Sequence, residues 1–142
     1  MVRAVNLRKG WMVLVLGVAA LALRAEPLRV DVFRSGSEGY AMYRIPGLLV
    51  TGQGTLLAYA EARRTSGSDW DAIDLVLRRS EDGGRTWRPQ QVIGRVPGKV
   101  EKSPVSPAGK RGEAAGITYN NPIAIAGRGK GVVHFVYCIE YM

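Results

Sequence analysis

The chain has few of the residues that cross-link small proteins or bind metal ions. Its 142 residues include one cysteine, Cys138, and one histidine, His134. One thiol cannot form an internal disulfide, and one histidine without partners at zinc-site spacing does not predict a metal centre. Both lie in an apolar, strand-like run, where we expect a buried Cys138 and a structural His134. A catalytic thiol is not favoured, because no neighbouring group would lower its pKa.

The chain also lacks an apolar run long enough for a typical transmembrane helix, which needs about 20 residues. Its apolar residues 11–23 follow Arg3, Arg8 and Lys9 and precede the small residue Ala25. This arrangement is typical of a secretory signal peptide. We therefore predict a signal peptide over residues 1–25 and a secreted or periplasmic protein. An uncleaved N-terminal membrane anchor is the alternative.

The positive charge is concentrated in that N-terminal segment. The net charge is +8, and residues 1–25 contribute four basic and no acidic residues, which leaves +4 for the remainder. The remaining charges are scattered, apart from a small cluster over residues 99–111. Nucleic-acid-binding proteins typically carry a basic stripe with interleaved aromatic residues, so we expect no nucleic-acid partner. A mildly basic surface suits an anionic substrate.

After residue 25 the sequence shows no helical periodicity, and short alternating segments separated by turn residues predict an all-β chain. Pro46 indicates an edge position or a β-bulge. The segment over residues 97–116 is rich in Pro, Gly, Lys and Ser and predicts a loop. We expect strands over residues 28–34, 43–50, 55–61, 73–79, 87–96, 117–126 and 131–139.

Residues 80–87, with the sequence SEDGGRTW, predict a tight hairpin. Ser80 and Asp82 have short polar side chains that can bond to the amides of the turn. Gly83 and Gly84 tolerate the positive φ that such turns require. Trp87 resumes the chain with a ring that can cover the base of the hairpin.

Four motifs occur in the order and near the spacing found in one enzyme family. They are Tyr43-Arg44-Ile45-Pro46, the strand 56–63, the stretch from Ser68-Asp69 to Ser80, and the hairpin just described. Together they resemble the N-terminal part of bacterial-type exo-sialidases, whose hairpin motif is called the Asp-box. The resemblance implies a six-bladed β-propeller. The chain would hold a first blade over residues 28–96, an inter-blade loop over 97–116 and the start of a second, truncated blade over 117–142.

The resemblance also assigns two binding residues. The family arginine that matches Arg44 is the first of three that hold the substrate carboxylate, which suits the bidentate fork of a guanidinium group. The arginine that matches Arg63 lines the sugar pocket. Arg64 is the alternative, because a slip of one residue exchanges the two.

The resemblance also assigns a catalytic acid and a polar residue that contacts the sugar. Asp69 matches the aspartate that acts as general acid and then as general base. Asp71 and Asp74 are alternatives, although Asp74 is better explained as a structural hydrogen-bonding partner. Asn121 matches an element that places a side chain near the sugar. Asn120 is the alternative, and Asn-Pro also begins ordinary turns.

The activity implied by the resemblance is hydrolysis of terminal sialic acids, with retention, from sialylated glycans, glycoproteins or gangliosides. It requires no cofactor and no metal ion. Such enzymes use a tyrosine nucleophile, because a neutral phenol is not repelled by the substrate carboxylate. No tyrosine of this chain matches that role, so we expect the chain alone to be inactive. Two alternatives are a non-catalytic glycan-binding propeller and a transferase that uses a sugar acceptor.

Overall fold

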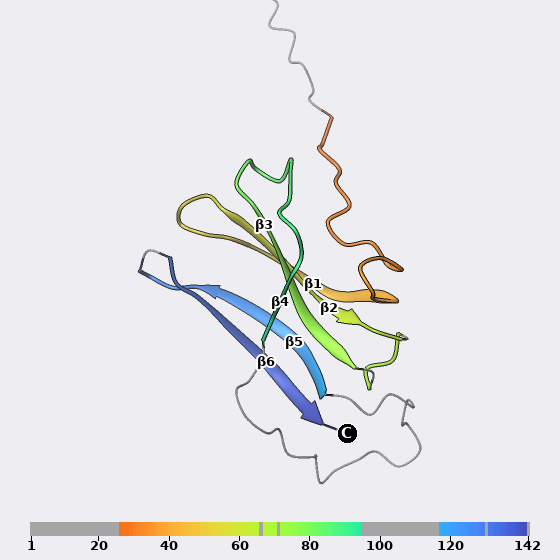
Figure 1. Cartoon of the computed structure of the whole chain (residues 1–142). Helices are drawn as coiled ribbons and strands as arrows, with labels where there is room; N and C mark the ends of the chain where they lie inside the picture. Colours follow the sequence, from red (N-terminus) through yellow and green to blue (C-terminus); the bar gives the residue numbers. More distant parts are fainter. Residues whose placement is uncertain (1–25, 66, 71, 95–116, 130, 142) are drawn as a thin grey trace, which may run out of the picture.

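The computed structural model describes residues 26–65, 67–70, 72–94, 117–129 and 131–141 (Figure 1). The predicted signal peptide, the predicted loop over residues 97–116 and Asp71 lie outside the described residues. The described part is all-β, as the sequence predicts, and contains no helix. It therefore offers no helical segment capable of crossing a membrane. Its strands are β1 Met42–Val50, β2 Leu56–Arg63, β3 Ile73–Ser80, β4 Gln91–Ile93, β5 Ile117–Ala126 and β6 Val133–Tyr141.

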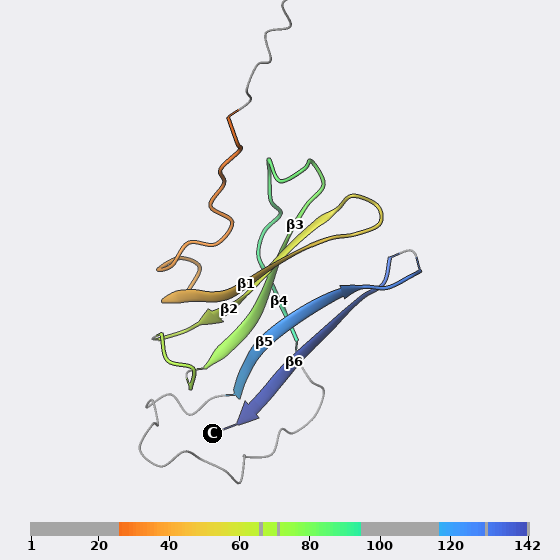
Figure 2. The same cartoon turned by 180° about the vertical axis from the view of Figure 1, so that it is seen from behind.

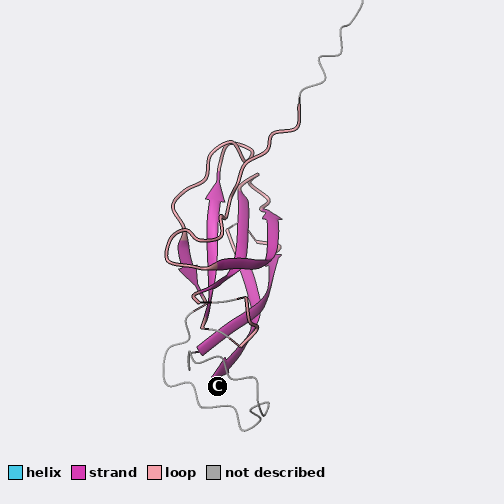
Figure 3. Ribbon diagram, turned by 90° about the vertical axis from the view of Figure 1, so that its right-hand side faces the viewer, coloured by secondary structure: helices cyan, strands magenta, loops and turns pink. Residues whose placement is uncertain are grey.

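Strands β1 to β4 form an antiparallel series in chain order. Strands β5 and β6 form a second antiparallel hairpin, which joins β3 through a parallel pair between Ile73 and Thr118. In Figures 1 and 2, β5 and β6 run alongside the first group of strands, and Figure 3 shows the strands from the side. This all-β arrangement is that of a partial β-propeller.

Two of the predicted strands need correction. Residues 28–34 form no strand but extended chain and bends, with Leu28 61% and Val30 41% exposed, and they pair with no strand in the described part of the chain. The predicted strand over residues 87–96 is reduced to β4. Trp87 turns back so that its Nε1–H donates to the carbonyl oxygen of Gly84, and Pro89 lacks the N–H that a strand ladder needs.

Strand β2 is the centre of the core, because both of its faces are covered. Side chains alternate along a strand, so Ala60 and Ala62 lie on one face, while Leu57 and Tyr59 lie on the other. We call these the first face and the second face. The first face packs against Tyr40, Val76, Phe33 and Tyr43, and the second against Leu77, Leu49, Ile93, Ala124, Val133 and Phe135.

Tyr59 joins the second hairpin to the second face of β2. Its ring meets Phe135 edge-on with 5.4 Å between ring centroids, and its hydroxyl oxygen accepts from the N–H of Ala124 at 3.2 Å. The ring also lies against Gly47, where a Cβ atom would be 2.1 Å from Tyr59 Cζ. A glycine at position 47 is therefore needed for this packing.

Two β-bulges change which face the preceding side chains occupy. In β1, Arg44 pairs with Glu61 and Gly47 pairs with Tyr59, so β1 has one extra residue in this interval. The predicted irregularity at Pro46 is thus confirmed. Ile45 has φ +49°, and the extra residue brings Arg44 onto the second face. Strand β5 repeats this feature between Asn120 and Ile123, ahead of another proline, with Asn121 at φ +53°.

The prediction of a buried Cys138 is wrong, because this side chain is exposed, and so is His134. Side chains of β6 point alternately toward and away from the rest of the sheet, and those of His134 and Cys138 point away from it. The inward set, Phe135 and Tyr137, packs toward the second face and the neighbouring strand. Alternation alone could not indicate which of the two sets would be covered.

The hairpin over residues 80–87 is held by its own polar side chains. Ser80 Oγ donates to Asp82 Oδ1 at 2.8 Å and accepts from the N–H of Gly84 at 2.9 Å. The hydroxyl and the N–H of Thr86 both donate to Asp82, at 2.6 and 2.9 Å. These hydrogen bonds, with that of the Thr86 hydroxyl foremost, hold the pKa of Asp82 well below its usual range.

Replacing Ser80 by alanine should lower the free energy of unfolding by about 1–3 kcal/mol, because the buried N–H of Gly84 would lose its acceptor. Urea denaturation of the full-length protein measures this change. The matched control is Ser35→Ala at an exposed position, which should change stability by less than about 0.5 kcal/mol. Equal stability of the Ser80 variant and the control would contradict the role assigned to this hydroxyl.

Candidate active site

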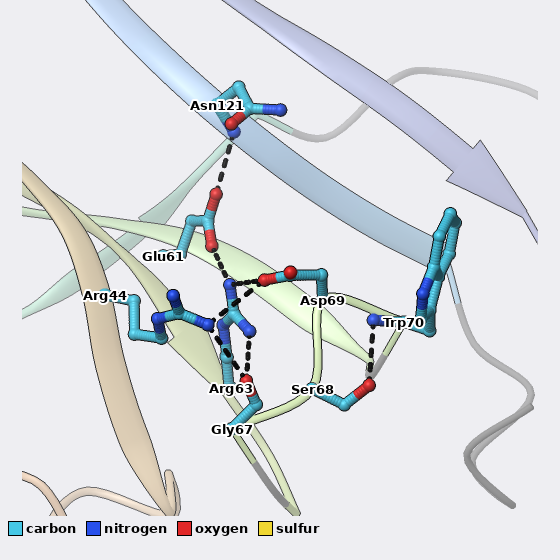
Figure 4. A network of polar contacts seen from close by, with 8 residues as sticks. All are labelled: Arg44, Glu61, Arg63, Gly67, Ser68, Asp69, Trp70 and Asn121. Atoms are coloured by element: carbon cyan, nitrogen blue, oxygen red, sulfur yellow. Dashed lines mark hydrogen bonds and ion pairs between the residues drawn. The ribbon is translucent and has the colours of Figure 1, made fainter. Parts of the chain in front are cut away.

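The second face of β2 becomes polar toward the end of the strand, where Glu61 and Arg63 follow Leu57 and Tyr59. Both residues are 1% exposed. The bulge in β1 places Arg44 opposite Glu61 on this face. Figure 4 shows these three side chains converging with the chain at Gly67 and with Asp69. A buried glutamate and a buried arginine are costly unless they are paired, so their contacts are specific.

Arg63 is the most connected of these residues. Its Nη2 donates to Glu61 Oε2 and to Asp69 Oδ1, both at 2.7 Å, and its Nη1 donates to the carbonyl oxygen of Gly67. The side chain is only 2% exposed. Burial works to lower the pKa of Arg63, but the hydrogen bonds to the two carboxylates outweigh it and raise the pKa above its ordinary value. In this arrangement Arg63 meets other protein groups and not solvent.

Arg44 and Asp69 form the exposed side of the cluster. Arg44 Nη1 lies 3.2 Å from Asp69 Oδ1 and 3.1 Å from the carbonyl oxygen of Gly67. Their side chains are 43% and 67% exposed, respectively. This contact places Arg44 and Asp69 at the same end of the sheet, so that one ligand could reach both. The structure thus brings together Arg44, Arg63 and Asp69, which the sequence singled out separately.

The alternatives Arg64 and Asp74 form a separate pair on the first face. Asp74 Oδ2 accepts from Arg64 Nη2 at 2.5 Å and from the Tyr40 hydroxyl at 2.8 Å. The Arg64 guanidinium lies 5.4 Å from the centroid of the Tyr40 ring. Burial, joined by the hydrogen bond to Asp74, raises the pKa of Tyr40 to about 12. Arg64 and Asp74 thus pair with each other on the face of β2 opposite to that of Arg63.

Asn121 joins the cluster through its backbone. Its N–H donates to Glu61 Oε1 at 2.8 Å, while its side chain is exposed. The other candidate, Asn120, has a buried Oδ1 atom with no hydrogen-bond partner among the described residues. The bulge in β5 therefore reaches the cluster, but the contact that it makes there is an amide N–H and not the expected side chain.

Glu61 is the member of the cluster that the sequence reasoning missed. It is the one charged residue among Leu56 to Ala62, and it lies two residues before Arg63. Residues two apart on a strand share a face, so this spacing signals a buried carboxylate–guanidinium pair. In Figure 4, Glu61 stands between Arg63 and Asn121.

Two cavities of the described part of the chain lie away from this cluster. One, of about 270 Å³, lies between the turn over residues 51–55 and the β5–β6 turn. The other, of about 320 Å³, is lined by Arg64, Asp74, Val92 and Tyr119, among others. Arg44 and Asp69 line neither of these two cavities. Within the described residues, no three His, Cys, Asp or Glu side chains are grouped to hold a metal ion.

Comparison with known proteins finds sialidases. The chain is 46% identical over 70 residues to a sialidase of Micromonospora viridifaciens and 41% identical over 64 residues to a sialidase of Bacteroides fragilis. It is 40% identical over 82 residues to sialidase-3 of Rattus norvegicus. These matches cover 48%, 44% and 54% of this chain but only 11%, 12% and 19% of the relatives. No family model matches the chain.

Fold, cluster and comparisons agree on one class of protein. The described part of the chain is an all-β partial propeller with an arginine–carboxylate cluster at the end of β2. The chain is similar to sialidases over about half of its length, at 33–46% identity. It spans less than one fifth of the length of each relative named above.

Proposed function

We propose that this chain is the N-terminal part of an exo-α-sialidase that removes terminal sialic acids from glycoconjugates. The observation that carries the proposal is the position of Asp69, a solvent-accessible carboxylate 3.2 Å from Arg44 Nη1. This pair places a cation for an acidic sugar next to a group that can transfer a proton. The sialidase relatives support the assignment of the substrate class.

In the proposed mechanism, Arg44 binds the carboxylate at the anomeric carbon of the sugar through its guanidinium fork. Asp69 donates a proton to the leaving glycosidic oxygen and then accepts one from the attacking water. The reaction proceeds with retention through a tyrosine nucleophile, which the proposal assigns to sequence beyond these 142 residues. No cofactor takes part.

The present contacts of Asp69 support the binding step. Its carboxylate accepts from both Arg44 and Arg63, so these guanidinium groups are already arranged around one carboxylate oxygen. A substrate carboxylate that approaches Arg44 would meet a donor held in place by β1. Because Arg63 is 2% exposed, its proposed contact with the sugar requires that Asp69 and the chain at Gly67 move aside.

Hydrolysis of 3′-sialyllactose by the full-length protein tests the proposal. We expect release of free sialic acid, first as the α-anomer in proton NMR, and no release by the 142-residue chain alone. Binding of the sugar without turnover would instead identify a glycan-binding protein. Transfer of the sugar to an added acceptor at the expense of hydrolysis would identify a transferase.

We further propose that residues 1–25 direct export to a secreted or periplasmic location. Their basic start, apolar centre and small residue at Ala25 support this. N-terminal sequencing of the exported protein tests it. A first residue near position 26 is expected, whereas an intact N-terminus in the membrane fraction would identify an anchor.

A further inference from the structure

Glu61 is a buried carboxylate that the proposed mechanism does not use. It lies on β2 and is 1% exposed, and each of its oxygens has a different partner. Oε2 accepts from Arg63 Nη2 at 2.7 Å, and Oε1 accepts from the N–H of Asn121 at 2.8 Å. It thus connects the first group of strands to the bulge of β5. A buried charge with such contacts needs an explanation beyond packing.

The charge of Glu61 acts close to Asp69. Both carboxylates accept from the same nitrogen, Arg63 Nη2, at 2.7 Å, and Arg44 Nη1 lies 3.2 Å from Asp69. Among the described residues, Asp69 thus accepts from two cations, and the anion Glu61 shares one of them. Neighbouring cations favour the ionised form of a carboxylic acid, whereas a neighbouring anion favours the protonated form. A general acid must carry its proton when the substrate binds.

Among the described residues, the strands next to β2 bring few charges toward the cluster. Strand β5 contains no acidic or basic residue, and its one titratable side chain is Tyr119. The nearest charge of β3, Asp74, lies on the first face with Arg64 and Tyr40. The charges that face Asp69 from β1 and β2 are those of Arg44, Arg63 and Glu61.

We propose that Glu61 is a positioning residue of the site. It offsets the charge of Arg63, so that Asp69 keeps its proton to higher pH than it would beside two uncompensated guanidinium groups. It also holds Arg63 against the β5 bulge through the N–H of Asn121. The inference rests on the proposed function, because the proton of Asp69 matters only if Asp69 acts as an acid.

The test is the pH dependence of kcat/KM for 3′-sialyllactose in the full-length protein and in Glu61→Gln. Glutamine keeps the shape of glutamate but removes its charge. We expect the alkaline limb of the profile to move by about one pH unit to lower pH, with about a tenfold loss of kcat/KM at neutral pH. If Glu61 had only a structural role, the substitution would lower kcat/KM at every pH without moving the alkaline limb. An unmoved limb, or one moved to higher pH, overturns the proposal.

The matched control is Glu81→Gln, which removes another ion-paired glutamate, one that pairs with Arg79 and Arg88 near the hairpin. Its profile should superimpose on that of the unaltered protein. If the unaltered protein shows no hydrolysis, it is the proposed function that fails. If it hydrolyses the substrate but Glu61→Gln leaves the limb in place, only the role of Glu61 fails.

A double variant covers the case in which Glu61→Gln does not fold, since it leaves a buried arginine without its partner. Glu61→Gln combined with Arg63→Gln removes the buried anion and cation together. If Glu61 offsets Arg63, the alkaline limb should remain within about 0.3 pH unit of its original position. A shift of about one unit to higher pH would show that Arg63 acted on Asp69 without compensation, which overturns the proposal.

Discussion

Replacing Asp69 by asparagine in the full-length protein should lower kcat for 3′-sialyllactose by about 100- to 10,000-fold, the usual contribution of a general acid and base. Asparagine keeps the size of the side chain but can neither donate a proton to the leaving oxygen nor take one from water. KM should change little, because Arg44 still binds the substrate carboxylate. Steady-state kinetics at several pH values measures both quantities.

Two comparisons make the result specific to proton transfer. An aryl sialoside has a more acidic leaving group and should lose less activity in this variant than the natural disaccharide. The matched control is Asp31→Asn, because Asp31 also lies 3.2 Å from an arginine, Arg34, and is 75% exposed. A variant at Asp69 with the kcat of the unaltered protein on the disaccharide would exclude the assigned role.

Replacing Arg44 by lysine should lower kcat/KM by about 10- to 100-fold, mainly through KM. Lysine keeps the charge but loses the planar fork, so one charge-assisted hydrogen bond to the substrate carboxylate, worth about 1.5–3 kcal/mol, is lost. The same change removes a contact with the carbonyl oxygen of Gly67, next to the loop of Asp69. Steady-state kinetics and the affinity for free sialic acid measure the loss.

The control for this variant is Arg34→Lys, which alters the surface pair with Asp31 and should leave the kinetics unchanged. A sialic acid derivative whose carboxylate is esterified provides a second comparison. Its affinity should be low for the unaltered protein and nearly the same for Arg44→Lys. An unchanged KM for the natural substrate in Arg44→Lys would count against a carboxylate clamp at this position.

Much of the fold and part of the cluster could be predicted from local patterns. Short segments of apolar residues bounded by turn residues located β1, β2 and β3 to within a few residues. Pro46 predicted the irregularity in β1, because a proline cannot donate to a strand ladder. Family motifs singled out Arg44, Arg63 and Asp69, which do lie together.

The sequence-based predictions were wrong or incomplete where the burial or pairing of a residue depends on residues far away in the chain. Cys138 lies on an alternating strand, but alternation does not say which set of side chains a neighbour will cover. Residues 28–34 alternate but pair with no strand among the residues that the structure describes. Nothing in the sequence around Glu61 indicates its contact with the N–H of Asn121, which lies 60 residues further along the chain.

The sequence by itself therefore determined the all-β character and the turn chemistry of residues 80–87, because these depend on neighbours along the chain. Its motifs also singled out Arg44, Arg63 and Asp69 as candidates. The tertiary structure decided which face each residue occupies and which charges meet. The bulges at Ile45 and Asn121 bring Arg44 and the N–H of Asn121 toward β2, and only there do Glu61 and Arg63 complete the arrangement. The physical reason is that a one-residue change of register moves a side chain to the opposite face, and register is set by the strands that pair across the sheet.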